Sequence, residues 1–216
     1  MTMANTFVHL RVHSEYSMVD GLVRVKPLIG RVAELGMPAV GLTEQSNMCS
    51  LVRFYKAAMG AGVKPIIGAD IWLENPDEPE TPFRLTLLAR DNDGYLNLTE
   101  IISQGYTEGQ RYGKPIVQKS WLESRAKGLI VLSGAKMGDV GKALLAGKPE
   151  LARERADYWR NLYPDNYYLE LQRTGRAGDE DCLHMSVELA AELGLPVVAT
   201  NDVHFLEADD FEAHEA

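Results

Sequence analysis

The chain of 216 residues has only two cysteines, and it contains no long apolar run. Cys49 and Cys182 are not in the closely spaced pairs typical of zinc sites, which favours free thiols in a reducing cytosol, although spacing alone leaves a disulfide between them open. No apolar run approaches the roughly 20 residues of a membrane span. The first residues also lack the basic and apolar regions of a signal peptide. We therefore expect a cytoplasmic protein without a membrane partner.

Basic residues are also fewer than acidic ones. The chain has 22 Lys and Arg against 31 Asp and Glu, which gives a net charge of −9. Domains whose main task is to hold a phosphate backbone present a basic excess, and an acidic chain repels nucleic acid. We therefore expect DNA binding by this chain alone to be weak. The apolar content of 45% and the charged content of 25% are ordinary for a soluble globular protein.

Short apolar runs alternate with segments of helical periodicity along nearly the whole chain. Strands are expected at 8–12, 39–42, 65–73, 85–89, 129–132, 167–171 and 197–199. Helices are expected at 25–35, 51–61, 95–103 and 180–193, and over 142–162 with an interruption near Gly147 and Pro149. The segments 75–82 and 105–113 are expected to be loops. This alternation predicts a mostly parallel sheet covered on both faces, and no linker is long enough to divide it into two domains.

Two segments repeat the same pattern. In 33–44 and again in 191–202, Ala-Glu-Leu-Gly is followed by one residue, a proline, a predicted strand and then a carboxylate. Glycine can take the left-handed conformation that ends a helix, and proline prevents its continuation. Parallel α/β folds place their chemistry at the carboxyl ends of strands. We therefore expect Glu44 and Asp202 to occupy equivalent positions at one end of the sheet.

Histidines and acids gather around the predicted strands. His13 and Asp20 follow the first strand, Asp70 lies within the third, and Asp202 and His204 follow the last. Imidazole and carboxylate are the preferred ligands of zinc, manganese and iron. Each residue taken alone is more often a surface or capping group. Because several of them recur at the ends of strands, the sequence favours a metal site and a purely structural group of residues about equally.

Several ordered motifs together resemble one family. The opening segment 7–21 reads Phe-Val-His-Leu-Arg-Val-His-Ser-Glu-Tyr-Ser-Met-Val-Asp-Gly, and later motifs include Lys-Pro-Ile-Ile-Gly-Ala-Asp at 64–70, Gly-Tyr-Leu-Asn-Leu at 94–98 and Ala-Thr-Asn-Asp-Val-His-Phe at 199–205. Segments 42–48, 83–89 and 168–172 complete the set. Together they resemble the PHP (polymerase and histidinol phosphatase) family, in the branch found at the N-terminus of bacterial replicative DNA polymerase III alpha subunits. The resemblance covers essentially the whole chain.

The resemblance implies a fold, a parent protein and partners. The fold would be α/β, a distorted (β/α)7 barrel similar to a TIM barrel. Residues 1–216 would form a single PHP domain, truncated at its C-terminus and without the polymerase regions. The parent would be a DNA-directed DNA polymerase, a nucleotidyltransferase with Mg²⁺ in an active site outside this chain. Related domains contact the remaining alpha-subunit domains and dock the proofreading exonuclease subunit, epsilon.

The resemblance also implies an altered metal site. Some positions keep the ligand types of the family: His13, Asp20, Asp70, Asp202 and His204, of which Asp70 is one methylene shorter than the usual glutamate. Other positions hold different residues where the family has histidines: Arg11, Gln45, Arg84 and, by a loose assignment, Thr174. A guanidinium group stays protonated, has no lone pair to donate and repels a divalent cation.

The two arginines suggest what replaced the metal. We expect Arg11 and Arg84 to point inward and to pair with Asp20, Asp70 and Asp202, with Glu44 as a supporting acid. The alternative is that both arginines point to solvent. Inward pairing predicts a non-catalytic structural platform without a cofactor, and the resemblance implies that this platform docks epsilon in DNA replication.

The competing function is enzymatic. An active metal-dependent phosphoesterase or 3′–5′ exonuclease would bind at least one metal ion and use it to activate water. Its ligands would be the five retained positions: His13, Asp20, Asp70, Asp202 and His204.

Overall fold

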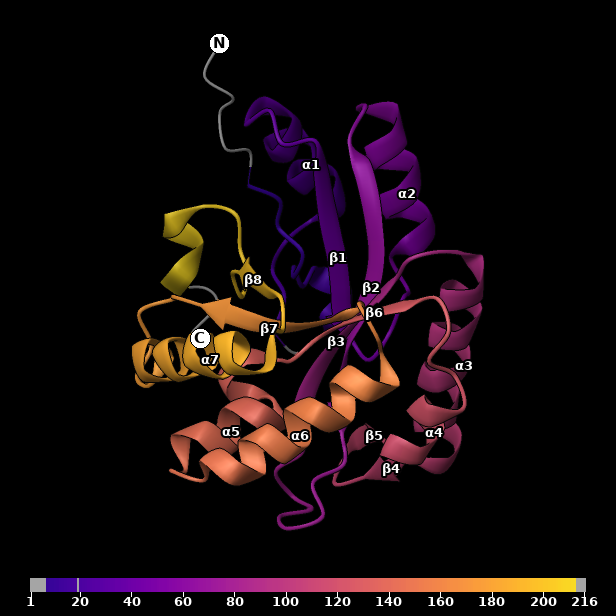
Figure 1. Cartoon of the computed structure of the whole chain (residues 1–216). Helices are drawn as coiled ribbons and strands as arrows, with labels where there is room; N and C mark the ends of the chain where they lie inside the picture. The colour runs from indigo at the N-terminus through magenta and orange to yellow at the C-terminus, as the bar shows by residue number, and fades with distance from the viewer. Residues whose placement is uncertain (1–6, 19, 213–216) are drawn as a thin grey trace.

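The computed structural model describes residues 7–18 and 20–212, which form a mixed sheet with helices packed around it (Figure 1). The strands are β1 (Ala39–Gln45), β2 (Lys64–Leu73), β3 (Phe83–Ala89), β4 (Gln110–Arg111), β5 (Lys114–Val117), β6 (Leu129–Leu132), β7 (Tyr167–Gln172) and β8 (Val197–Thr200). The α-helices are α1 (Val25–Glu34), α2 (Leu51–Gly60), α3 (Asn92–Glu108), α4 (Lys119–Glu123), α5 (Asp139–Leu145), α6 (Pro149–Leu162) and α7 (Asp179–Leu193). Single 3₁₀ turns occur at Glu15–Ser17, Ala135–Met137 and Ala208–Asp210.

The sheet is less parallel than predicted. Its strand order is β4-β5-β2-β3-β6-β7-β8, with β1 paired to β2. Strand β3 runs antiparallel to both β2 and β6, so the predicted mostly parallel sheet is wrong at this point. The reason is the short connection between β2 and β3, since a parallel crossover needs about a dozen residues or more. That connection is closed on itself, because the side-chain amide of Asn75 donates to the carbonyl of Thr81 at 2.9 Å.

The predicted strand at 8–12 is not a regular strand. Within this part of the chain, Val12 forms an isolated parallel bridge with Val203, while its amide donates to the hydroxyl of Thr43 rather than to a backbone carbonyl. The amide of Gly41 donates to the carbonyl of His9 at 2.6 Å. A Cβ at Gly41 would lie 2.6 Å from the carbonyl oxygen of Leu10, so glycine permits this close approach. The segment lies between β1 and Val203, held by sparse and irregular bonds.

Closure of the sheet stays a prediction. The strands assigned among residues 7–18 and 20–212 do not form a closed ring. The bonds that run across the gap include those from the amide of Thr43 to the carbonyl of Val12, at 3.0 Å, and from the amide of His13 to the carbonyl of Val203, at 2.9 Å.

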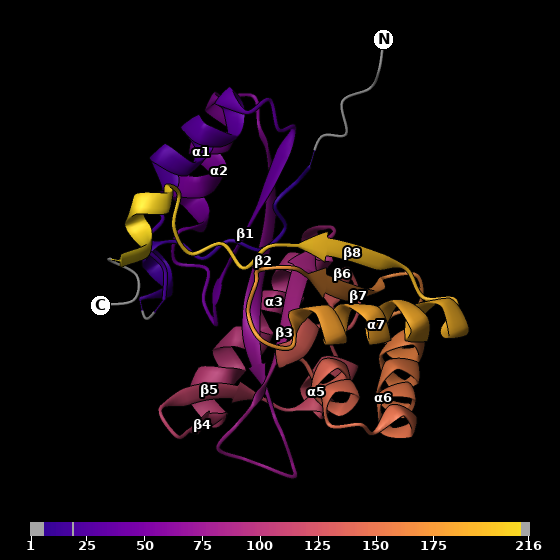
Figure 2. The same cartoon turned by 90° about the vertical axis from the view of Figure 1, so that its left-hand side faces the viewer.

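Two apolar clusters hold the sheet and helices together. The larger joins β2, β3, β6 and β7 to α3, α5, α6 and α7, and contains the fully buried Trp159. The smaller joins α1, α2 and β1. Helix α1 contributes Val25, Leu28, Ile29 and Val32, the spacing that places side chains on one face of a helix. Figure 2 shows α1 and α2 beside β1, with α5, α6 and α7 grouped near β7.

Two predicted details of the helices can be compared with the structure. The interruption within 142–162 is confirmed, because α5 ends at Leu145, Gly147 has a positive φ of 67° and Pro149 begins α6. The predicted loop at 105–113 is wrong. Helix α3 continues to Glu108, and β4 and β5 then form a hairpin whose turn contains Tyr112 and Gly113 at positive φ.

Two further findings concern the helices and the cysteines. None of the helices in the described part of the chain is both long and apolar enough to cross a membrane. Cys49 is exposed, Cys182 is buried, and both are free thiols.

Candidate functional site

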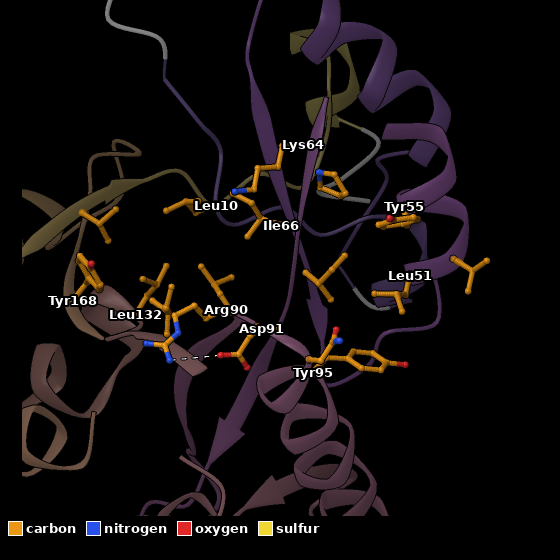
Figure 3. A pocket seen from close by; sticks show the side chains of 18 of the residues that line it. Leu10, Leu51, Tyr55, Lys64, Ile66, Arg90, Asp91, Tyr95, Leu132 and Tyr168 are labelled. Carbon is orange, nitrogen blue, oxygen red and sulfur yellow. Dashed lines mark ion pairs between the residues drawn. The ribbon is translucent and has the colours of Figure 1, made fainter. Parts of the chain in front are cut away.

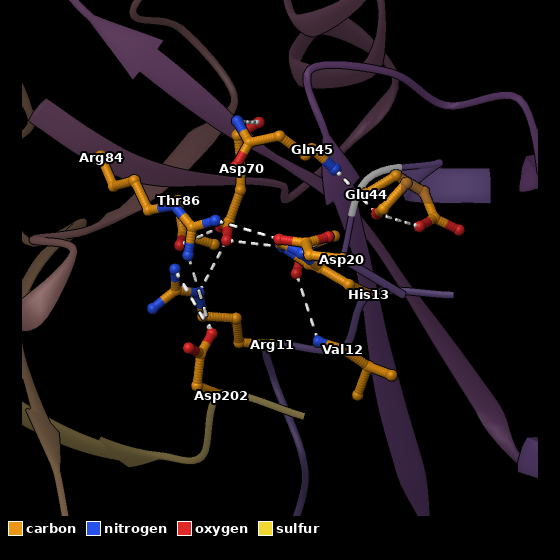
Figure 4. Close-up of polar contacts among 12 residues, drawn as sticks. Arg11, Val12, His13, Asp20, Glu44, Gln45, Asp70, Arg84, Thr86 and Asp202 are labelled. Carbon is orange, nitrogen blue, oxygen red and sulfur yellow. Dashed lines mark hydrogen bonds and ion pairs between the residues drawn. The ribbon is translucent and has the colours of Figure 1, made fainter. Parts of the chain in front are cut away.

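Arg11 lies inside a buried cluster of charges (Figure 4). Its side chain is 2% exposed, and its Nε donates to Oδ2 of Asp70 at 2.6 Å. Its terminal nitrogens lie 3.7 Å from Oε1 of Glu170 and 3.6 Å from Oδ1 of Asp202. Burial alone would lower the pKa of Arg11, but the three carboxylates outweigh it and raise that pKa. Arg11 is therefore a permanent buried cation, and its predicted pairing with acids is confirmed.

Arg84 approaches the same acids from β3. Its Nη2 donates to Oδ2 of Asp20 at 3.2 Å, and its Nη1 lies 3.8 Å from Oδ1 of Asp202. The guanidinium group also lies 5.1 Å from the ring centroid of Trp72, within the range of a cation–π contact. The inward orientation predicted for Arg84 is confirmed.

Asp70 links the first segment of the chain to β2 and β3. Its Oδ2 accepts hydrogen bonds from Arg11 and from Nε2 of His13, the latter at 2.8 Å, while its Oδ1 accepts the hydroxyl of Thr86. Burial would raise the pKa of Asp70, but the charge of Arg11 and the bond from His13 hold it well below its usual value. Both carboxylate oxygens are therefore committed to neighbours within the protein.

His13 is held between two carboxylates. Its Nδ1 lies 3.0 Å from Oδ1 of Asp20, and its Nε2 bonds Asp70. Burial would lower the pKa of His13, but the bonds to Asp20 and Asp70 raise it from 6.5 to about 9. A protonated imidazole donates from both nitrogens and has no lone pair for a metal. At neutral pH His13 is therefore a third cation of the cluster.

Asp202 forms the opposite wall. Its Oδ1 lies 3.1 Å from Nε2 of His204, and its Oδ2 accepts from Nη1 of Arg176 at 2.8 Å. Burial would raise the pKa of Asp202, but the bond from His204 and the charge of Arg11 lower it. The bridge between Val203 and Val12 brings these residues to Arg11.

Two members of the cluster were missed in the sequence. Glu170 is fully buried on β7, and burial raises its pKa although the charge of Arg11 opposes this. Its signal was a single acid within an otherwise apolar strand. Arg176 lies half-exposed ahead of α7 and gave no comparable signal.

Glu44 was expected to join the arginines, and this prediction is wrong. Its carboxylate is buried among serines, accepting from the amide and hydroxyl of Ser14, from the Ser17 hydroxyl at 2.7 Å and from the Ser50 hydroxyl at 2.8 Å. Asp70 is in register with Gln45, and neighbouring residues of a strand face opposite sides of the sheet. Glu44 therefore points away from the cluster (Figure 4) and is not equivalent to Asp202.

The two remaining predicted positions differ from each other. The side-chain amide of Gln45 lies beside the cluster and donates to the backbone carbonyl of Asp70 at 3.2 Å. The amide and hydroxyl of Thr174 instead donate to Oδ2 of Asp179, at 2.9 and 2.7 Å. Thr174 therefore stabilises the beginning of α7, and the structure does not bring it into the charge cluster.

Comparison with known proteins identifies the family. The model of the PHP domain matches residues 9–174. The chain belongs to the PHP domain family. The DNA polymerase III subunit alpha of Pseudomonas aeruginosa is 56% identical over 213 residues, which cover 99% of this chain and 18% of that protein. The subunit of Escherichia coli K12 is 51% identical over 209 residues, covering 97% of this chain and 18% of that protein. The chain thus spans less than a fifth of the length of these relatives.

Solved structures share the fold of this PHP domain at low sequence identity. An amidohydrolase from Chromobacterium violaceum has a TM-score of 0.59 and 12% identity, with 96% of this chain and 95% of that chain covered. A Bifidobacterium adolescentis protein assigned to the metal-dependent phosphoesterases has the same TM-score and identity, with 94% and 89% covered. At this identity the likeness shows an α/β fold with a mixed sheet, and nothing about activity.

The candidate metal ligands of this PHP domain already have partners within the protein. Among the described residues, His13, Asp20 and His204 offer ligand atoms within 4.8 Å of one another. Each of these groups already has a partner within the protein. His13 bonds the carboxylates of Asp20 and Asp70, Asp20 also accepts a hydrogen bond from Arg84, and His204 bonds Asp202. The guanidinium groups of Arg11 and Arg84 lie against acids of the same cluster, and a guanidinium group repels a divalent cation.

The raised pKa of His13 predicts a pH dependence of stability in this PHP domain. Because the pKa is about 9 when folded and 6.5 in the unfolded chain, protonation of His13 favours folding. This contribution is complete below pH 6.5 and is lost as the pH rises through 9, by on the order of 3 kcal/mol. Urea unfolding at pH 6.5 and 9.5 should show that loss, and His13→Gln should flatten it. If the free energy of unfolding fell by the same amount between the two pH values in wild type and in His13→Gln, the raised pKa of His13 would be contradicted.

Proposed function

We propose that this chain is the PHP domain of a replicative DNA polymerase III alpha subunit and acts as a non-catalytic structural platform in the cytoplasm. Sequence identity over nearly the whole chain to curated alpha subunits supports the role in replication. The observation that carries the non-catalytic part is the burial of Arg11 against Asp70, Glu170 and Asp202. A fixed guanidinium supplies positive charge where the family places metal ligands.

Charge balance explains how such a cluster is stable. Four carboxylates meet here: Asp20, Asp70, Glu170 and Asp202. Without cations they would repel one another and their pKa values would rise. Arg11, Arg84, Arg176 and protonated His13 supply matching positive charge from several segments of the chain. The cluster thereby ties Arg11, His13 and Asp20 to β2, β3, β7 and the segment after β8.

The same cluster supports a closed barrel. We propose that the irregular segment from His9 to Ser14 completes a distorted (β/α)7 barrel by occupying the place between β1 and Val203. The support is its hydrogen bonds to Gly41, Thr43 and Val203. Arg11 adds ion pairs from this segment to β2 and β7, so side-chain charge replaces part of the missing ladder.

The proposed partners are the remaining alpha-subunit domains and the epsilon exonuclease subunit. DNA synthesis, with Mg²⁺ as cofactor, would take place in parts of the parent polymerase outside this chain. We expect epsilon to co-purify with the complete polypeptide that carries this chain, and removal of the PHP domain to abolish or strongly weaken that association. DNA binding by the 216-residue chain should be weak and quickly lost with salt, since an acidic chain neutralises few phosphates. Undiminished epsilon binding without the domain, or salt-resistant DNA binding by the chain, would show that epsilon is the wrong partner for this domain.

A metal-dependent phosphoesterase or 3′–5′ exonuclease is the second candidate. The observation in its favour is the grouping of His13, Asp20 and His204. We expect no hydrolysis of phosphate esters or of DNA 3′ ends above background in Mn²⁺ or Zn²⁺, because losing metal ligands costs more than the roughly 10- to 100-fold caused by losing their supporting partners. Metal-stimulated hydrolysis that disappears in His13→Ala would favour this second function.

A further inference from the structure

A large apolar groove lies at the beginning of β2 and shares no residue with the charge cluster. Its volume is about 780 Å³. Figure 3 shows Leu51 and Tyr55 of α2 on one side, Leu132 and Tyr168 on the other, and Ile66 between them. A concavity of this size with mostly apolar walls is typical of a binding site.

The groove exists because two strands separate. Strand β2 begins at Lys64, but its pairing with β3 begins only at Gly68. Strand β3 ends at Ala89, and Asp91 then caps α3 by accepting the amide of Gly94. Among the described residues, 64–67 therefore have a strand neighbour only on the β1 side. Pro65 lacks an amide proton, so this edge is poorly suited to pair with a further strand.

The rim of the groove carries exposed apolar side chains. Val52 is 62% exposed, Tyr55 is 51% exposed and Tyr95 is 38% exposed. Val52 and Tyr55 share one face of α2, whereas that helix buries Phe54 and Ala58 in the apolar core. Apolar surface gathered around a concavity in this way marks a place where proteins bind.

The charge beside the groove is opposite to that of the whole chain. Lys56 and Lys64 line it, both are exposed, and neither forms an ion pair with a described residue. Arg90 and Asp91, which also line it, lie 3.5 Å apart and balance each other. A chain of net charge −9 thus presents two lysines without ion-pair partners among the described residues next to this apolar groove.

We propose that this groove binds a short segment of a partner protein in which apolar side chains alternate with Asp or Glu. The apolar side chains fill the space between α2 and the beginnings of β2, β6 and β7. The acids meet Lys56 and Lys64, which favours such a segment over a basic one. The inference does not rest on the proposed function, because it uses neither the charge cluster nor the identity of the parent protein.

Two focused peptide libraries test this inference. Both have ten residues with the same varied apolar positions, and they differ only in carrying Glu or Lys between them. They are selected against the complete polypeptide that carries this chain, and binding of recovered peptides is measured by fluorescence anisotropy. We expect binders from the Glu library only, with affinity that falls as salt is added.

Matched variants locate the binding. Tyr55→Glu and Lys64→Glu should each weaken binding by about tenfold or more. Tyr106→Glu and Lys26→Glu change an exposed tyrosine and an exposed lysine outside the groove, and should leave affinity unchanged. Circular dichroism confirms that each variant is folded.

Several results would overturn the proposal. Binders from neither library, binders from both alike, or binders indifferent to Tyr55→Glu would remove the groove as an acidic-peptide site. Self-association that Tyr55→Glu abolishes would assign the groove to a second copy. Peptides that bind the 216-residue chain but not the complete polypeptide would assign it to another part of the same polypeptide.

Discussion

Replacing Arg11 with alanine is expected to lower the free energy of unfolding by about 3–5 kcal/mol, the cost of breaking a buried ion pair. The substitution leaves Asp70, Glu170 and Asp202 close together in the interior without their shared cation. Chemical denaturation at neutral pH measures this loss, when wild type and variant are analysed with a shared dependence of the unfolding free energy on denaturant concentration (the m-value).

The origin of that loss can be separated from simple loss of packing. In Arg11→Ala/Asp70→Ala the second change removes one of the stranded carboxylates, so the double variant should lose less than the sum of the two single losses. Arg173→Ala is the matched control, because Arg173 forms an exposed ion pair with Glu180, and it should leave stability nearly unchanged. Additive losses, or an Arg11→Ala variant as stable as wild type, would show that Arg11 does not balance the buried acids.

Glu44→Ala is expected to cost at least about 3 kcal/mol, because unsatisfied buried donors cost about 1–3 kcal/mol each. The carboxylate of Glu44 accepts bonds from Ser14, Ser17 and Ser50, and so joins the turn after the first segment to β1 and to the beginning of α2. Thermal and denaturant unfolding measure the effect.

Two controls test the reason. Glu44→Gln keeps the shape and one acceptor oxygen and should lose less stability than Glu44→Ala. Glu188→Ala, at an exposed position of α7, should change stability by no more than about 0.5 kcal/mol. If Glu44→Ala behaved like Glu188→Ala, the serine bonds would carry little of the stability, and their burial would need another explanation.

Sequence patterns predicted the elements better than their pairing. Helical periodicity located α1, α2, α6 and α7, because a single amphipathic face is visible in the residue order. The direction of β3 was missed, since strand direction depends on the length of the connection after β2 and on which neighbours are available. The hairpin after α3 was missed because its glycines and tyrosines are typical of loops, and only the pairing of β4 with β5 distinguishes a hairpin.

The site was predicted in part for a similar reason. Arg11 and Arg84 lie in apolar runs at motif positions, and that combination indicated buried pairing. Glu44 was misplaced because the register of β1 against β2 decides which face it takes, and the sequence alone does not set that register. Arg176 reaches Asp202 from a loop, at a distance along the chain that no periodicity describes.

The central claim is that arginine charge replaces bound metal in this PHP domain. The most direct test is the metal content of protein purified without chelators and without a metal-affinity column, measured by inductively coupled plasma mass spectrometry. The account predicts zinc, manganese and iron far below stoichiometric amounts, and an unfolding midpoint that EDTA does not change. Stoichiometric metal that EDTA removes, with a fall in stability or the loss of a hydrolytic activity, would contradict it.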